Sequence, residues 1–143
     1  MLNSTKIRVI YADTDAMGIV YHTNYIKWFE IGRTELFRDL GIVFSEWEGE
    51  GVSFPLTRAY CHYLQPARYD DLLWIDTEIE YLRRASIKFR SVVRNEKRSQ
   101  VLAAGYTVHA CLDREGRIVR IPRRMAEMIA KGINTKTGDN YGK

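Results

Sequence analysis

The sequence predicts an α+β protein in which a curled antiparallel sheet of about five strands covers one long helix. Two patterns lead to this class. Apolar residues recur every three or four positions between about residues 23 and 40, as on one face of a helix of roughly five turns. Strand-like segments then follow one another with short polar connections, which is typical of antiparallel hairpins. One curled sheet offers enough apolar surface to cover such a helix.

The elements follow in chain order. A short strand at residues 6–11 precedes a polar segment, and Gly41 has the position of a stop after the long helix. Gly32 in mid-helix indicates that another element packs closely there, because glycine costs about 1 kcal/mol against alanine. The Gly/Glu-rich stretch 46–51 is read as a connection. The strands of the sheet are expected at residues 54–64, 72–82, 85–94 and 101–112, and the pattern is compatible with a last short one at 118–121.

The end of the chain carries a second, shorter helical pattern. Pro122 is expected to open a helix from Arg123 to Lys131, and Gly132 to close it. Residues 1–132 are therefore predicted to form a single domain. Residues 133–143 contain one aliphatic side chain in eleven residues and are predicted to be a flexible tail.

Composition narrows the classes of function. The chain has 143 residues, with 45% hydrophobic and 28% charged residues, as an ordinary globular domain has. The net charge of +4 favours an anionic partner such as a phosphate group, but it is too small to require nucleic acid. No apolar run approaches the ~18 residues of a membrane span, and the N-terminus lacks a signal pattern. No membrane insertion is expected.

The two cysteines argue for a reducing compartment. Cys61 and Cys111 are fifty residues apart, and no CxxC pair or Cys/His cluster exists. A disulfide framework or a zinc site is therefore not expected, and the predicted location is the cytoplasm.

The segment 13-DTDAMGIVYHTNY-25 collects polar and turn-forming residues just before the long helix. Three interpretations of Asp15 remain open. With Asp13 and His22 it could bind a hard metal ion, although such sites need more carboxylates. It could cap a turn. It could also be a catalytic carboxylate beside a helix N-terminus, whose N–H groups stabilise an oxyanion while Gly18 lets the backbone approach a ligand.

The other side chains of the segment have simpler interpretations. A histidine such as His22 is more often a hydrogen-bonding or packing residue than a general base. Tyr21 and Tyr25 suit walls or the core, and Thr23 and Asn24 suit an N-cap. The chain contains no GxSxG motif, phosphate-binding glycine loop or dinucleotide-binding glycine motif, so these enzyme classes lose their usual support.

The stretch RVIYADTDAMGIVYHTNYIKWFEIGR resembles the hotdog-fold acyl-CoA thioesterases of the 4-hydroxybenzoyl-CoA thioesterase family, and within it the bacterial branch associated with the Tol–Pal gene cluster. The resemblance covers roughly residues 3–131 and implies a hotdog fold. It assigns the catalytic carboxylate to Asp15 and the backbone N–H that polarises the thioester carbonyl to His22. Another branch of the family uses a mid-helix glutamate, for which Glu30 or Glu35 would be available.

The resemblance also implies a substrate site and partners. Gly18, Ile19, Val20 and Tyr25 would contact the substrate, and Arg83 and Arg84, followed by Ser86, would hold coenzyme A phosphates. A solvated turn is the simpler view of this arginine pair, and the group Arg117, Arg120, Arg123 and Arg124 is a less specific alternative.

The implied reaction is hydrolysis of a small acyl-CoA without metal or other cofactor, with Asp15 as nucleophile or general base. The implied assembly is a homodimer or homotetramer with active sites at subunit interfaces. An enzyme acting on acyl-carrier-protein thioesters and a non-catalytic binding protein remain as alternatives.

Overall fold

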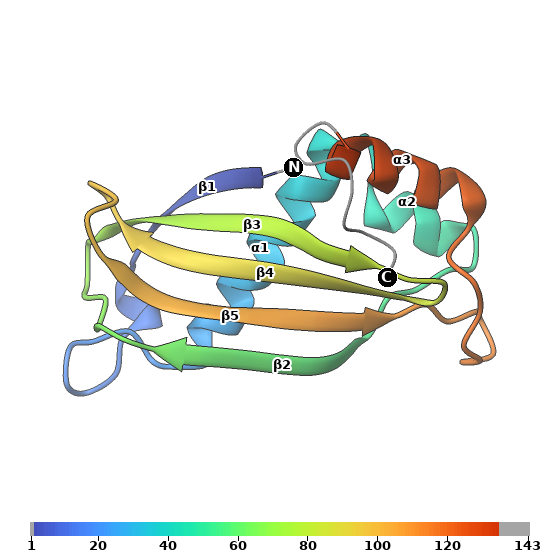
Figure 1. Cartoon of the computed structure of the whole chain (residues 1–143). Coiled ribbons are helices and arrows are strands. Elements are labelled where there is room, and N and C mark those ends of the chain that lie inside the picture. The colour runs from blue at the N-terminus through green and yellow to red at the C-terminus, as the bar shows by residue number, and fades with distance from the viewer. Residues whose placement is uncertain (1, 135–143) are drawn as a thin grey trace.

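A computed structural model describes residues 2–134 and shows one antiparallel sheet with a long helix across its face (Figure 1). The sheet order is β1-β3-β4-β5-β2, so β1 and β2 are the edge strands. The bounds of the longer elements are β1 Leu2–Arg8, α1 Asn24–Asp39, α2 Phe44–Gly49, β2 Leu56–Tyr63, β3 Leu72–Leu82, β4 Ser86–Asn95, β5 Val101–Ala110 and α3 Arg123–Asn134. The predicted α+β class and hotdog fold are confirmed.

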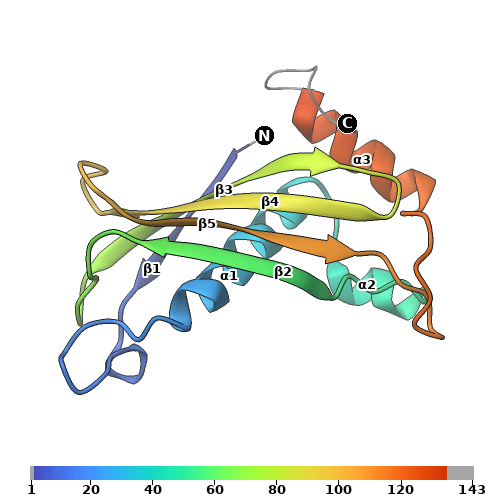
Figure 2. The ribbon, with the colours of Figure 1, turned by 60° about the horizontal axis from the view of Figure 1, so that its bottom comes forward.

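Alternation along the strands decides which face of the sheet meets the helix. In β4, the side chains of Ile87, Phe89, Ser91 and Val93 are all buried, while the positions between them are more exposed. The sheet curls so that this buried face turns toward α1, and α2 and α3 lie at one end (Figure 2). Within residues 2–134, none of the helices has the length and apolar character needed to cross a membrane.

Gly32 is where α1 comes closest to the sheet. A Cβ atom at this position would overlap the Oγ1 atom of Thr77 on β3 and would lie 3.2 Å from Cγ2 of Ile75. The predicted close approach in mid-helix is therefore confirmed. The helix ends as predicted at Gly41, which has φ +84°. There the N–H of Ile42 donates to the Phe37 carbonyl at 2.8 Å, which satisfies one of the last carbonyls of the helix.

The buried apolar residues form two clusters along α1. One joins the C-terminal half of α1 to α2, α3 and the ends of β3 and β4, and it includes Phe37, Trp47 and Met125. The other joins the N-terminal half to the loop before it and to β3 and β5, and it includes Trp28 and Leu73. The second cluster supports the segment that carries Asp15 and His22.

Several predicted boundaries were wrong at the N-terminal half. β1 begins at Leu2 and ends at Arg8, and Tyr11–Asp13 form a 3-10 turn instead of strand. Thr23 occupies the N-cap position, as predicted, but it makes no side-chain cap hydrogen bond, and the side chain of Asn24 donates to the Asp13 carbonyl.

Three further predictions at the C-terminal half and in the connection need correction. Phe44–Gly49 is the short helix α2, where a connection was expected. Ile118 forms only an isolated bridge with Leu112, so residues 118–121 are not a strand. Gly132 lies inside α3, which runs to Asn134, and a Cβ atom at this position would overlap the side chain of Leu40. The expected domain boundary at 132 therefore falls within a helix, and the rest of the expected tail, 135–143, lies outside the described residues.

The edge strand β2 differs from the other strands because it is exposed at every position except Cys61, which is half-buried. Among the described residues it pairs only with β5, so no strand lies along its other edge. The strand begins near the β3–β4 turn, since Leu56 pairs with His109 and His109 with Ile87. It ends beside the start of α1.

Candidate active site

The two acids of the DTD segment have different surroundings. Asp13 is buried, with 3% of its surface exposed. Its carboxylate accepts a hydrogen bond from the N–H of Ile10 at 3.0 Å and forms an ion pair with Lys27 at 3.1 Å. Its backbone carbonyl accepts a hydrogen bond from the side-chain amide of Asn24 at 2.8 Å. Asp13 therefore holds the loop to the first turn of α1, and its carboxylate is occupied by structural contacts.

Asp15 is half-buried and sits in a small turn. Its N–H donates to the Ile19 carbonyl at 2.9 Å, and Gly18, with φ +78°, donates back to its carbonyl at 3.0 Å. One carboxylate oxygen, Oδ1, accepts the N–H of Met17 at 2.8 Å. Within the described residues the other oxygen has no hydrogen bond or ion pair. The carboxylate is thus oriented at one oxygen and available at the other.

The start of α1 offers N–H groups to a ligand. An antiparallel bridge pairs Thr14 with Val20 and closes the turn between them. The chain leaves this turn at Val20 and reaches His22 two residues later. In the part of the chain that the structure describes, the N–H groups of His22 and Thr23 have no acceptor, whereas the next N–H, that of Asn24, donates to Tyr21 at 3.0 Å. Free N–H groups at a helix start attract developing negative charge. The His22 side chain is exposed and stacks at an angle on Tyr21.

An apolar cavity of about 270 Å³ adjoins this helix start. It is formed by the end of β2, the following turn and the DTD loop, and its walls are Ile19, Val20, His22, Tyr25, Tyr63, Leu64, Gln65 and Pro66. A larger cavity of about 410 Å³ lies beside Asp70, Asp71 and Lys97, and its walls are mainly polar or charged. Since an acyl group needs apolar walls beside the reacting carbonyl, the smaller cavity is the better acyl site.

The structure brings together most of the residues predicted for the site. The turn that holds Asp15 also contains Gly18 and Ile19, and Val20, His22 and Tyr25 follow it into the first turn of α1. Tyr63, Leu64 and Pro66 were not predicted. Their only signal in the sequence is an aromatic residue at the end of a predicted strand, followed by a turn that contains proline. This signal does not predict that the end of the strand lies against the start of the long helix.

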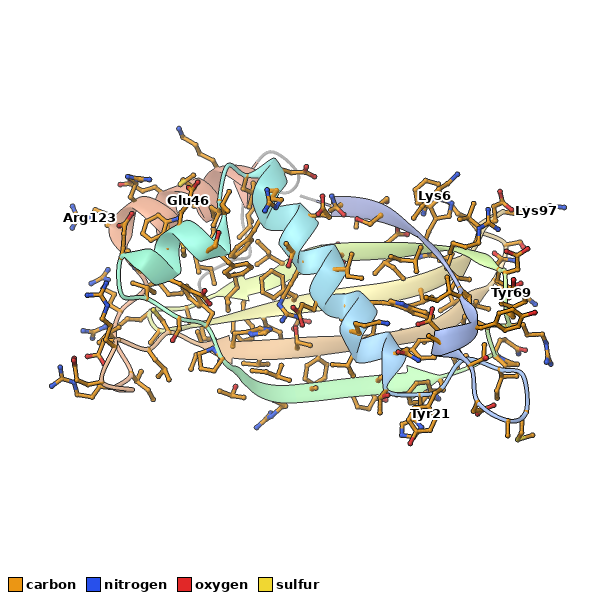
Figure 3. The ribbon with its side chains drawn as sticks, turned by 180° about the vertical axis from the view of Figure 1, so that it is seen from behind. Lys6, Tyr21, Glu46, Tyr69, Lys97 and Arg123 are labelled. Atoms are coloured by element: carbon orange, nitrogen blue, oxygen red, sulfur yellow. The ribbon has the colours of Figure 1, made fainter. Side chains whose placement is uncertain are left out.

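Arg83 and Arg84 are not part of this group within one chain. They form the β3–β4 turn at the opposite end of the sheet from the DTD loop (Figure 1). The Arg83 guanidinium lies 3.9 Å from the ring centroid of Tyr81, and the turn is closed by the Arg83 N–H donating to the Ser86 carbonyl at 2.9 Å. Seen from behind, Tyr21 and Tyr69 mark the loop end, and Glu46 and Arg123 mark the opposite end (Figure 3).

Two alternatives for the chemistry find no support in the geometry. Glu30 and Glu35 are exposed on α1, and Glu30 borders a separate cavity of about 300 Å³ with Arg33 and Arg38. Neither glutamate lines the apolar cavity beside His22. Among residues 2–134, no three His, Cys, Asp or Glu side chains gather in a way that could hold a metal ion.

The single curled antiparallel sheet around one long helix defines the hotdog class of folds, and the half-buried carboxylate, the helix N–H groups and the apolar cavity lie at one end of it. Comparison with known sequences agrees, since the profile of the thioesterase-like superfamily matches residues 9–130. The chain belongs to the thioesterase-like superfamily. The sequence prediction of a thioester hydrolase is thereby confirmed at the level of the family.

Individual relatives are consistent with this assignment. The acyl-CoA thioester hydrolase YbgC of Escherichia coli O157:H7 is 36% identical over 107 residues, which is 75% of this chain and 79% of that protein. The crystal structure of a DHNA-CoA thioesterase from Staphylococcus aureus superposes with a TM-score of 0.88 at 26% identity, covering 99% of both chains. A 4-hydroxybenzoyl-CoA thioesterase mutant bound to 4-hydroxybenzoyl-CoA has the same fold, with a TM-score of 0.82 at 23% identity, over 90% of this chain and 98% of that one.

Proposed function

We propose that the protein hydrolyses the thioester of a small acyl-CoA to the free acid and coenzyme A, with Asp15 as the catalytic carboxylate. The observation that carries this proposal is the difference between the two acids of the loop. Asp13 is buried in structural contacts, whereas Asp15, in the loop that leads into the start of α1, has one carboxylate oxygen without a hydrogen bond among the described residues. The family membership and the names of the relatives support the same reaction.

The chemistry follows from this arrangement. The thioester carbonyl carbon lies within reach of Asp15, and the carbonyl oxygen accepts the His22 N–H, which stabilises the tetrahedral oxyanion. One such donor is worth about 10²–10³ in rate. Asp15 either attacks the carbonyl, which expels the CoA thiolate and leaves a mixed anhydride for water to open, or takes a proton from the attacking water. A burst of CoA equal to the enzyme concentration would identify the first route.

The acyl group fits the cavity beside Tyr25 and Tyr63. At about 270 Å³ within one chain, the cavity suits a short or single-ring acyl group better than a long chain. Its walls are mainly apolar, with aromatic rings from Tyr25 and Tyr63 whose centroids are 5.1 Å apart. This geometry supports the small substrate in the proposal.

A second copy of the chain supplies the phosphate site in this proposal. The free edge of β2 is suited to pair with the β2 of another copy, which would run antiparallel to it. Because β2 begins near the Arg83–Arg84 turn and ends near His22, this pairing brings the partner's turn to the loop end. The partner's β4 would lie about 15 Å away, or three strand spacings, from β2 of this chain. A homodimer, or a tetramer of two such dimers, thus unites the carboxylate with a CoA-binding arginine pair.

The test is a panel of acyl-CoAs and acyl-carrier-protein thioesters of increasing acyl size, assayed with the wild type and with Asp15→Asn. We expect hydrolysis of small acyl-CoAs, greatly reduced in the variant. Faster hydrolysis of the acyl-carrier-protein thioesters would mean that the reaction is the proposed one but that the substrate is a carrier-protein thioester. If the purified wild type hydrolyses no member of the panel, the protein is not a thioesterase. The free thiols of Cys61 and Cys111 suit the cytoplasm, in which we place the reaction.

A further inference from the structure

Tyr63 connects the end of the edge strand β2 to the first turn of α1. Its hydroxyl donates to the backbone carbonyl of His22, with an Oη–O distance of 2.9 Å. The same carbonyl also accepts the N–H of Tyr25 at 3.3 Å. The Tyr63 ring packs edge-on against Tyr25, with ring centroids 5.1 Å apart, and it lines the apolar cavity. One side chain therefore touches both the proposed acyl site and the peptide at the helix start.

The bonded carbonyl belongs to the peptide whose N–H is that of Thr23. Because a peptide unit is planar and trans, holding its oxygen also sets the direction of its N–H. This N–H has no acceptor among the described residues, and neither has that of His22 on the preceding peptide. Hydrogen bonds in series polarise one another, so donation by Tyr63 to the carbonyl makes the Thr23 N–H a stronger donor.

We infer that Tyr63 is a positioning residue for the oxyanion site: its hydroxyl orients and polarises the His22–Thr23 peptide, so that the Thr23 N–H acts as a second donor beside that of His22. This inference rests on the proposed thioesterase function. It separates two parts of one side chain. The ring contributes to the binding of the acyl group, and the hydroxyl acts on the transition state through the peptide.

The hydroxyl keeps its proton under all conditions in which the enzyme would work. Burial, together with the neighbouring Cys61 and Tyr25, raises the pKa of Tyr63 to about 12. A group that stays protonated donates a hydrogen bond at every pH below that range. The contribution of Tyr63 to the rate should therefore be independent of pH, unlike that of a general acid.

The experiment compares Tyr63→Phe with Tyr60→Phe. Both tyrosines lie on β2 with similar exposure, 44% and 50%, but Tyr60 stacks on Tyr106 away from the cavity. Each variant keeps its ring and loses one hydroxyl. For Tyr63→Phe we expect kcat to fall about 5- to 30-fold with KM nearly unchanged, because an interaction realised only in the transition state is lost. The loss should be the same from pH 6 to 9, and Tyr60→Phe should match the wild type.

Each other outcome has a defined meaning. An unchanged kcat in Tyr63→Phe, while Asp15→Asn is inactive, overturns the inference and leaves the proposed function standing. A raised KM at unchanged kcat shows that the hydroxyl only contacts the substrate, and a loss that changes with pH shows acid catalysis; both overturn the positioning role. An equal loss in Tyr60→Phe means a general effect of β2 and also overturns it. A wild type that hydrolyses no thioester overturns the function and the inference together.

Discussion

The two ends of the sheet carry different groups of residues. The loop end holds Asp15, the free N–H groups of His22 and Thr23, and an apolar cavity. The end with the β3–β4 turn holds the exposed pair Arg83 and Arg84 and, close by, the arginine-rich segment 114–124. One end therefore has the parts that we propose for acyl chemistry, and the other has the arginines that we propose to bind coenzyme A.

This difference is the reason for the proposed dimer. One curled sheet around one helix places the two regions at opposite ends of the chain (Figure 1). In the proposed dimer, an antiparallel copy beside the exposed edge of β2 would bring the turn end of one chain to the loop end of the other. The comparison thus predicts that variants at the loop end change kcat, variants at the turn change KM, and variants between them change stability.

The sharpest contrast lies within the loop end, between Asp15 and Asp13. Asp15→Asn should keep the fold and lower kcat by at least about 10³-fold, since the amide can neither attack nor accept a proton. Asp13→Asn should instead lower the melting temperature, because it weakens the ion pair with Lys27 and the contact with the Ile10 N–H. Steady-state kinetics and thermal unfolding of both variants measure the two effects.

His22→Ala is the matched control for the loop end. It should cost less activity than Asp15→Asn, because the group that we propose to act at this position is the backbone N–H. A loss as deep as that of Asp15→Asn would show that the imidazole is itself catalytic. Normal turnover in a folded Asp15→Asn protein would move the chemistry to Glu30 or Glu35.

Gly32 lies midway between the two ends of the sheet, where α1 packs closely against β3. A substitution at Gly32 tests this contact between the helix and the strand. Gly32→Leu should lower the free energy of unfolding by about 3 kcal/mol, because even its Cβ would collide with Thr77 and approach Ile75. Gly49→Ala in α2 is the control, since a Cβ there meets no atom within 4 Å. Urea unfolding of both variants gives the comparison, and an unchanged midpoint for Gly32→Leu would mean that α1 can move away from β3.

His109, at the turn end, should make the fold sensitive to acid. Burial, aided by the charge of Arg33, lowers the pKa of His109 to about 4, while the ring contacts the Phe54 carbonyl and the Thr107 hydroxyl at 3.0 Å each. In the unfolded chain a histidine has a pKa of about 6.5. As pH falls from about 6.5 to about 4, the unfolded state binds the proton first, so stability decreases across this window.

The expected contribution of His109 is about 2 kcal/mol between pH 7.5 and 4.5. Urea unfolding at both pH values measures it, with His109→Gln to remove the titrating group and His62→Gln, at an exposed position of β2, as the control. The difference between the two pH values should shrink only in His109→Gln. If both variants keep the full difference, carboxylates such as Asp76 account for it. Burial would raise the pKa of Asp76, but hydrogen bonds from Arg98, Ser4 and Arg94 outweigh this and lower it.

The smallest effect is expected at the turn itself. Replacing Arg83 and Arg84 by alanine should raise KM for acyl-CoA about 5- to 10-fold with little change in kcat, because the phosphate contacts are equal in ground and transition states. Added salt should reduce the penalty, since screening weakens the wild-type contact as well. Acyl-pantetheine substrates, which lack these phosphates, should not distinguish the variant from the wild type. An unchanged KM would place the phosphates elsewhere, first at Arg117, Arg120, Arg123 and Arg124.

Mixing two variants, each defective at one end of the sheet, would test whether the loop end of one chain and the turn end of another form one active site. In a mixed dimer of Asp15→Asn and the double-arginine variant, one site combines an intact Asp15 with an intact turn. After exchange of subunits, about one quarter of all sites should then regain wild-type KM at low substrate concentration. Activity equal to the average of the separate proteins would show that Asp15 and the arginines of different chains do not share a site.

Local sequence patterns determined much of the fold because they report on neighbours along the chain. The period of α1, the alternation in β3–β5 and the stop at Gly41 are set by backbone geometry and burial within each element. The order of Asp15, Gly18 and His22 likewise predicted the candidate site, since all three lie within one loop and the residues just before one helix.

Other features could be known only from the tertiary structure, because they depend on contacts between residues far apart in sequence. Gly132 lies inside α3 and packs beside Leu40, where the local pattern predicted a stop. Tyr63 reaches His22 across 41 positions of the chain, and its place at the site depends on where β2 ends. In the sequence, Asp13 and Asp15 are the same residue type, two positions apart, and nothing local distinguishes their roles. Their difference arises because burial and Lys27 occupy one carboxylate, while the turn at Gly18 leaves an oxygen of the other free.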